Sequence, residues 1–196
     1  MSQVLTAKHY GLSVEDLPKS EEYLTLHFSP TRNPRQQRWR HYGLSADFLG
    51  DYFSNFFPGE EDTAAVISRR DTIKASVSYI ANELLENAVK YSCTKANRTI
   101  SITLSLYEHD IVFHAINYSD ISSTEQYQSF IQSLLEADIN ELYLTQLEAS
   151  AIEPDNSQMG LLTMIQDYSA QFGWSFRSLD DNPDIICTQV AARLSI

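Results

Sequence analysis

The sequence predicts an α+β fold in which helices cover one face of a sheet. The first indication is a long segment, about Thr63 to Tyr91, whose apolar residues recur at helical spacing. The second is a hairpin of two alternating segments, Thr99 to Tyr107 and Ile111 to Tyr118, joined by a short polar turn. A similar pair of strands, Trp174 to Leu179 and Ile185 to Leu194, is expected near the end of the sequence.

The chain between the two hairpins is expected to be mostly helical. Two helices, Thr124 to Leu135 and Ile139 to Leu147, form a helical insert within residues 124 to 148 and precede the polar loop Glu153 to Gln158. The last helix is expected to begin after Gly160 and to end where Gly173 breaks it.

Residues 1–62 are expected to form an N-terminal extension of a domain that spans 63–196. Tyr23 to Ser29 alternates apolar and polar residues, as a half-buried strand does. Ser45 is expected to cap a short helix that runs to Phe56. Its aromatic face is more typical of a docking or dimer surface, or of core, than of a cofactor site. The members of that face are Phe48, Leu49, Tyr52, Phe53 and Phe56.

Composition narrows the class of protein. A chain of 196 residues with 43% hydrophobic residues suits one compact domain with an appendage and argues against disorder. No apolar run approaches the roughly 20 residues that cross a bilayer, and no secretory leader is expected because Met1 to Tyr10 lacks a hydrophobic segment. Cys93 and Cys187 have neither zinc-site nor disulfide-framework spacing. We therefore expect a cytoplasmic protein that does not enter a membrane.

Charge is spread unevenly along the chain. The formal net charge is −12, and residues 44–196 alone carry −14, because they hold eight Lys and Arg against twenty-two Asp and Glu. This balance opposes binding to nucleic acid and favours a basic protein partner. The basic run Arg32 to Arg40 could bind RNA, with Trp39 stacking on a base. Such a short run is more often a solvated loop, or a segment that pairs with the protein's own acidic residues.

The most informative segment of the chain lies near the end of the long predicted helix. Glu83 and Asn87 are four residues apart and therefore share one helical face. An apolar stripe on the same helix predicts that its opposite side faces the core. The stripe consists of Ile73, Val77, Ile80, Leu84 and Ala88. A carboxylate and a carboxamide could thus point together at one ligand.

The segment from Asn82 to Ser92 resembles the first ATP-binding motif of the GHKL superfamily, which includes histidine kinases, gyrase-type ATPases and anti-sigma-factor serine kinases. The resemblance implies a two-layer α/β sandwich of the histidine-kinase-like ATPase type, with a mixed sheet covered by helices. It implies ATP and Mg²⁺ as cofactors, with Asn87 on the metal ion that the nucleotide carries. It also implies that Glu83 is the catalytic base and that Lys90 lies in the cofactor site.

Two further segments bear on the resemblance. Gly160 and Leu161 are similar to the glycine segment at which the family's ATP lid meets a helix N-terminus, although Gln158 replaces the first glycine. The family's adenine motif, Asp-x-Gly-x-Gly, falls on Asn117 to Ile121, where its three key residues are missing. Asn117 or Asp120 would then lie near adenine, with Asn117 a weaker acceptor than a carboxylate. The glycine motifs are therefore degenerate.

Three interpretations stay open at this point. The chain is an ATP-dependent protein serine kinase or ATPase, nearest to the anti-sigma-factor type, that acts in signalling by partner switching. Alternatively, it is a catalytically inactive pseudo-kinase that serves as a protein-interaction module. In the third, an unrelated α+β domain matches the motif by accident, which would leave Glu83 and Asn87 exposed and far from any pocket. The expected partner is a regulatory protein, either antagonist or effector, and a homodimer is a further candidate.

Overall fold

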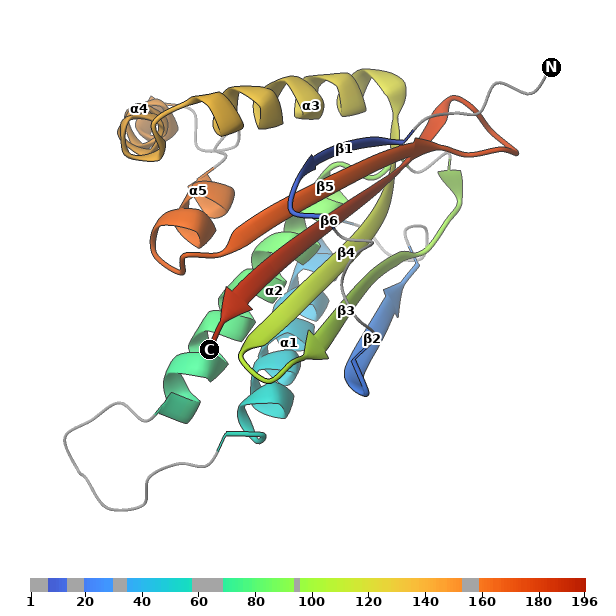
Figure 1. Ribbon diagram of the computed structural model, residues 1–196. Coiled ribbons are helices and arrows are strands. Elements are labelled where there is room, and N and C mark those ends of the chain that lie inside the picture. Colours follow the sequence, from blue (N-terminus) through green and yellow to red (C-terminus); the bar gives the residue numbers. More distant parts are fainter. Residues whose placement is uncertain (1–6, 14–19, 30–34, 58–68, 94–95, 153–158) are drawn as a thin grey trace, which may run out of the picture.

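The computed structural model describes residues 7–13, 20–29, 35–57, 69–93, 96–152 and 159–196. These residues form an α+β fold that is built on one six-stranded sheet (Figure 1). The strand order is β1-β5-β6-β4-β3-β2. The six strands are β1 Lys8–Gly11, β2 Glu22–Phe28, β3 Ile100–Leu106, β4 Asp110–Asp120, β5 Gln171–Ser178 and β6 Ile185–Ser195.

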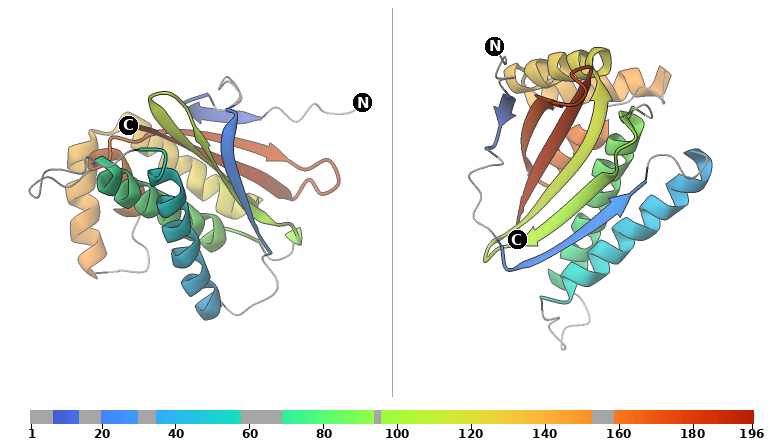
Figure 2. Two further views of the ribbon diagram at one scale, coloured as in Figure 1. Left: turned by 90° about the horizontal axis from the view of Figure 1, so that it is seen from below. Right: turned by 90° about the vertical axis from the view of Figure 1, so that its right-hand side faces the viewer.

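Five helices accompany the sheet. Two of them, α1 Arg35–Ser54 and α2 Arg69–Lys90, lie next to each other and cover one face of the sheet (Figure 2). Then α3 Ile121–Glu136 runs across one end of the sheet, and α4 Ile139–Ile152 turns away from it (Figure 1). The short helix α5 Met159–Gln166 connects this helical segment to β5. The layers are those of a two-layer α/β sandwich.

The expectation of a mixed sheet is wrong for the described strands, because all five of their pairings are antiparallel. The two predicted hairpins are present as β3–β4 and β5–β6. They join through β4 and β6, whose register sets Asn117 opposite Thr188. The helical segment between the hairpins brings the chain to β5, which lies on the side of β6 away from β4. The next strand, β6, then pairs antiparallel with β4.

The N-terminal residues belong to the same sheet and the same core. The predicted strand at Tyr23 is confirmed as β2, which pairs with β3 along its whole length. The sequence did not reveal β1, a strand of four residues that pairs with β5 at the opposite edge of the sheet. The chain therefore contributes its N-terminal strands to both edges of the sheet.

The expected short helix beginning at Ser45 is wrong in its start, because α1 begins ten residues earlier, at Arg35. The arginines and glutamines before Ser45 are good helix formers, and they extend the helix through much of the basic run. Ser45 lies inside the helix and donates from Oγ to the carbonyl of His41 at 2.7 Å. The first residues of the basic run, Arg32 to Pro34, lie outside the described residues.

The long helix is confirmed over Arg69–Lys90, while its expected first turns, from Thr63, lie outside the described residues. Both helices of the insert are confirmed as α3 and α4, and the loop Glu153 to Gln158 lies outside the described residues. The expected end of the last helix at Gly173 is wrong. That helix, α5, ends at Gln166, and a left-handed turn at Ser169 (φ 53°) sends the chain into β5.

The core lies between the two helices and the covered face of the sheet. The apolar stripe of α2 is buried, as predicted, and meets β3 and β4. Its partners across the layer include Leu104 and Phe113, both fully buried. None of the helices in the described residues combines the length and the apolar character needed to cross a bilayer.

The close approach of α1 and α2 depends on Gly50. A Cβ at Gly50 would lie 2.1 Å from Ser78 Oγ and 2.8 Å from the Lys74 carbonyl oxygen. We expect Gly50→Ala to lower the free energy of unfolding, measured in urea, by about 1–3 kcal/mol through overpacking. Gly43→Ala in the same helix meets nothing within 4 Å and should raise stability by up to about 1 kcal/mol. Equal losses in both variants would contradict this account.

Candidate functional site

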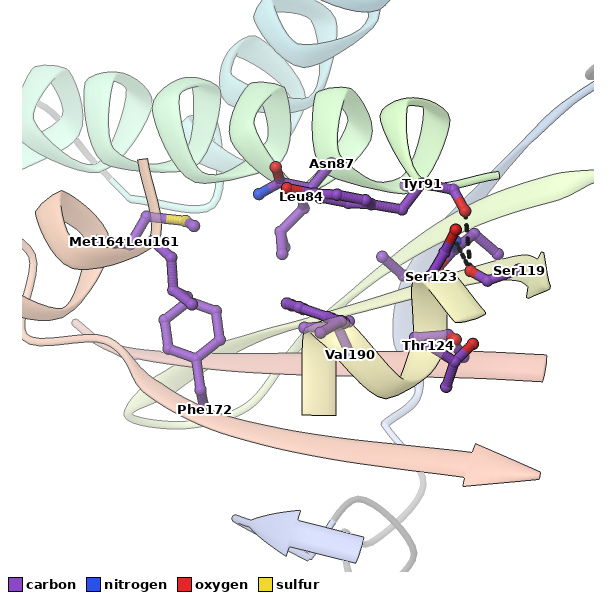
Figure 3. A pocket seen from close by; sticks show the side chains of 15 residues that line it. Leu84, Asn87, Tyr91, Ser119, Ser123, Thr124, Leu161, Met164, Phe172 and Val190 are labelled. Atoms are coloured by element: carbon purple, nitrogen blue, oxygen red, sulfur yellow. Dashed lines mark hydrogen bonds between the residues drawn. The ribbon is translucent and has the colours of Figure 1, made fainter. Parts of the chain in front are cut away.

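One cavity lies where the end of α2 meets the sheet, α3 and α5 (Figure 3). Its volume is about 20 Å³, which is room for about one water molecule. Side chains from six elements, α2, β4, α3, α5, β5 and β6, line it, together with Tyr91 just after α2. Those labelled in the close-up are Leu84, Asn87, Tyr91, Ser119, Ser123, Thr124, Leu161, Met164, Phe172 and Val190, and the rest are Ala88, Ala115, Asn117, Tyr127 and Thr188.

Three of the predicted site residues come together in this cavity. Asn87 belongs to α2, Asn117 to β4 and Leu161 to α5, so they are brought from separate parts of the sequence. Asn87 reaches the cavity because the apolar stripe of α2 faces the sheet, and position 87 lies at the border of that stripe. Asn87 is half-buried and lines the cavity, whereas a motif matched by accident would leave this side chain exposed and far from any pocket.

The polar floor of the cavity lies on the two central strands. Asn117 and Thr188 are direct cross-strand neighbours, so their side chains lie side by side on the same face. Asn117 donates from Nδ2 to Ser119 Oγ at 3.2 Å, and Ser119 donates to the Tyr91 carbonyl at 2.8 Å. Thr188 is 2% exposed, and its Oγ1 has no hydrogen-bond partner among the described residues. A buried hydroxyl of this kind is satisfied by a water or by a ligand.

Aromatic side chains close the cavity towards α3. The Tyr91 and Tyr127 rings stack with centroids 5.6 Å apart and planes inclined by 12°. Trp174 donates from Nε1 to the Tyr127 hydroxyl at 3.0 Å. Burial raises the pKa of Tyr127, so this phenol stays neutral at physiological pH. This wall fixes α3 against the sheet and narrows the cavity.

Glu83 lies one turn before Asn87 on α2 but does not line the cavity. Its carboxylate packs against the start of α5, where a Cβ at Gly160 would lie 1.7 Å from Glu83 Oε2. Burial, and secondly the nearby Glu86 carboxylate, raise the pKa of Glu83. Gly160 therefore provides the space that the Glu83 side chain occupies. The two residues that the sequence singled out separately are in direct contact.

The other two predicted site residues have different surroundings. Asp120 is the N-cap of α3, and its Oδ1 accepts from the Ser123 backbone N–H at 2.8 Å. Lys90 places Nζ 5.5 Å from the centre of the Tyr91 ring. Neither residue lines the cavity. Each is a sequence neighbour of a lining residue, since Lys90 precedes Tyr91 and Asp120 follows Ser119.

Sequence reasoning missed Thr188, Tyr91 and Tyr127 as cavity residues. Alternation along the last predicted strand would have set Thr188 on the inner face, but nothing in the sequence paired that position with Asn117. Tyr127 lines the cavity only because α3 lies across the end of the sheet (Figure 1). Such pairings depend on strand register and helix placement, which no local pattern encodes.

No match to the chain was found, either among protein-family models or among curated proteins. In the described parts of the chain, no three His, Cys, Asp or Glu side chains gather as a metal site would need. The donor set at the cavity is instead made of carboxamides and hydroxyls. Such groups suit a neutral or phosphate-bearing ligand that brings its own Mg²⁺, because such an ion needs only one or two protein oxygens.

The unpartnered hydroxyl gives a stability prediction. Thr188→Val keeps the side-chain shape and removes a buried hydroxyl that bonds to no described residue, so the free energy of unfolding should stay equal or rise by about 1 kcal/mol. Thr124→Val is the matched control in the same cavity, since Thr124 Oγ1 donates to the Asp120 carbonyl at 2.8 Å. That variant should lose about 1 kcal/mol. Urea unfolding of both variants tests the assignment, and a larger loss in Thr188→Val would contradict it.

The buried carboxyl of Glu83 gives a pH prediction. Because its pKa is raised on folding, the folded protein keeps the proton to higher pH than the unfolded chain, and the free energy of unfolding falls as pH rises between the two pKa values. Gln stays neutral, so Glu83→Gln should gain stability over wild type at about pH 7.5 relative to about pH 4. The exposed Glu125→Gln controls for loss of charge. An advantage that did not grow with pH would disprove the claim.

Proposed function

We propose that the protein is a signalling regulator of the GHKL type, which binds a magnesium nucleotide in the cavity beside Asn87 and acts on a protein partner. One observation carries the proposal. Asn87, Asn117 and Leu161, which were singled out for their place in three separate motifs, line the same cavity. A chance match to a single motif would not bring the other two segments to the same place.

The order of elements also supports this proposal. The chain runs from a long helix through a hairpin, a helical insert and a short helix to a second hairpin. Two of these helices cover one face of the sheet, as the resemblance implies (Figure 2). Fold-level similarity alone does not establish an activity, so the proposal depends on the cavity.

Each residue has a role that follows from its chemistry and place. The Asn87 carboxamide oxygen would hold the Mg²⁺ that the nucleotide carries. When bound, this ion neutralises phosphate charge. Asn117 and the unpartnered Thr188 hydroxyl form a polar pair on the cavity floor that suits the polar edge of a base. The raised pKa of Glu83 moves this carboxyl towards the range that a general base needs, although its side chain packs against Gly160.

The cavity must open before a nucleotide can enter. Its volume of about 20 Å³ is far below the roughly 300 Å³ at which ligand pockets begin. The Tyr91 and Tyr127 stack and the start of α3 form the wall that would move. Opening costs free energy, so we expect weak nucleotide binding in the absence of a partner that stabilises the open form.

The same closed cavity supports the second candidate, a pseudo-kinase that works only as an interaction module. The adenine motif lacks its glycines, and Ser119, which stands at one of those positions, bonds to the Tyr91 carbonyl within the wall. Ile121 begins α3 at another of them. Ser119 and Ile121 thus place side chains where the backbone could approach a nucleotide closely only if both residues were glycine.

The partner would be a basic protein that meets α3 and α4. From Ala115 to Phe176 the sequence contains no Lys, Arg or His. The two helices present acidic and apolar side chains together. The exposed members are Glu125, Glu136, Asp138, Glu141 and Glu148, with Leu135, Leu144 and Leu147.

Calorimetric titration with Mg-ADP and with a non-hydrolysable ATP analogue tests nucleotide binding. We expect a measurable affinity that Asn87→Ala lowers at least about tenfold, because a ligand to a charged group is lost. Asn82→Ala is the control on the same helix, since Asn82 donates to Glu86 at 2.8 Å and does not line the cavity. Equal binding by Asn87→Ala would refute the site. No binding by the wild type at millimolar nucleotide would favour the interaction module.

A further inference from the structure

A row of apolar side chains runs along the outer side of α1. Leu44, Phe48 and Tyr52 on the helix and Phe56 in the turn just after it follow one another at intervals of four residues, and we call them the α1 stripe. Their exposed fractions are 69%, 51%, 38% and 40%. The inner side of the same helix is already buried in the core through Tyr42, Ala46, Leu49 and Phe53. The helix therefore has a second apolar side that no described residue covers.

The rings of the α1 stripe are held in a fixed arrangement. Phe48 and Tyr52 have centroids 6.2 Å apart, and Tyr52 and Phe56 are 5.6 Å apart in an edge-on contact. Tyr52 also packs edge-on against the buried Phe53 at 5.3 Å. Such preformed aromatic ridges lose little conformational entropy when another surface covers them, and aromatic residues dominate the energetic centres of interfaces.

We propose that the α1 stripe is the interface of a homodimer, in which two α1 helices cross about a twofold axis. Residues spaced by four form a ridge, and two such ridges interdigitate when helices cross at about −50°. In a twofold dimer the same ridge meets itself, so one row of residues suffices for both sides of the interface. The axis would pass between Phe48 and Tyr52, the centre of the row.

Charge favours a second copy over other occupants. A chain of net charge −12 repels its copies at most surfaces, and the acidic α3 and α4 surface is the clearest example. The α1 stripe carries no charge. Asp51, which borders it, is paired with Lys74 of α2 at 2.5 Å. Two copies can thus meet at the stripe without bringing two unpaired Asp51 carboxylates together.

The area available fits a reversible dimer. A Phe or Tyr side chain buries about 150–250 Å² when fully covered, so four residues at these exposures offer roughly 300–400 Å² per copy. Neighbouring exposed residues, such as His41 on α1 and Asn55 just after it, would bring the total for both copies towards the roughly 1,200 Å² at which specific interfaces begin. We therefore expect dissociation at about micromolar concentration. No residue of α1 lines the cavity, so this proposal stands independently of nucleotide binding.

Sedimentation velocity over a range of protein concentrations tests the dimer. The wild type should pass from monomer to dimer across the micromolar range, and Phe48→Asp should weaken dimerisation by at least about 30-fold, as loss of a central hot-spot residue does. Leu144→Asp is the control, since Leu144 is 62% exposed on α4. It adds the same charge elsewhere and should dimerise like the wild type. A wild type that stays monomeric up to high micromolar concentration would overturn the proposal.

A second measurement protects the test against misfolding of the Asp variant. Tyr52→Cys lies next to the proposed axis and should form a disulfide-linked dimer under mild oxidation, because a residue near a twofold axis lies close to its own copy. Leu144→Cys should not. Both retain Cys93 and Cys187, so the wild type reports background cross-linking. Equal cross-linking of Tyr52→Cys and Leu144→Cys would exclude the α1 stripe as the interface.

Discussion

The packing of α2 on the sheet is the interaction on which the other features depend. Val77, Ile80 and Leu85 are fully buried, and they hold the helix against the covered face of the sheet. Burying each such side chain contributes about 1.5–3 kcal/mol, so the orientation of this helix is strongly fixed. Once it is fixed, Asn87 points to the part of β4 and β6 that holds Asn117 and Thr188. The cavity, its polar floor and its contact with α5 all follow from this placement.

The site combines features of a ligand pocket with features of a packed core. The two strands bring Asn117 and an unpartnered Thr188 hydroxyl to one place, which a purely structural core avoids. The stacked Tyr91 and Tyr127 rings, and Trp174 hydrogen-bonded to Tyr127, pack over the same cavity as side chains pack in a core. A regulator that binds its ligand only when a partner moves α3 would need both features. A module that has lost its ligand would keep only the second.

Two surfaces of opposite character lie on different helices. The α3 and α4 surface is acidic, and the α1 stripe is aromatic and uncharged. Electrostatics therefore supports different kinds of partner in our proposals, a basic protein for the first surface and a second copy for the second. Residues of α3 line the cavity and residues of α1 do not. Of the two surfaces, therefore, only the α3 and α4 surface can directly affect access to the cavity.

The sequence by itself determined the α2 helix, both hairpins and the two helices of the insert, because hydrophobic periodicity is a local property. It also determined that Asn87 and Glu83 share one face of a helix. Only the tertiary structure decided that Asn87 meets Asn117, Thr188 and Leu161 at one cavity, because their meeting depends on strand register and on layer packing. It likewise split the aromatic face of α1 into buried Leu49 and Phe53 and exposed Phe48, Tyr52 and Phe56, because burial depends on where α2 lies. The antiparallel edge strand β1 was beyond prediction for the same reason, since four residues carry too little pattern to reveal their partner.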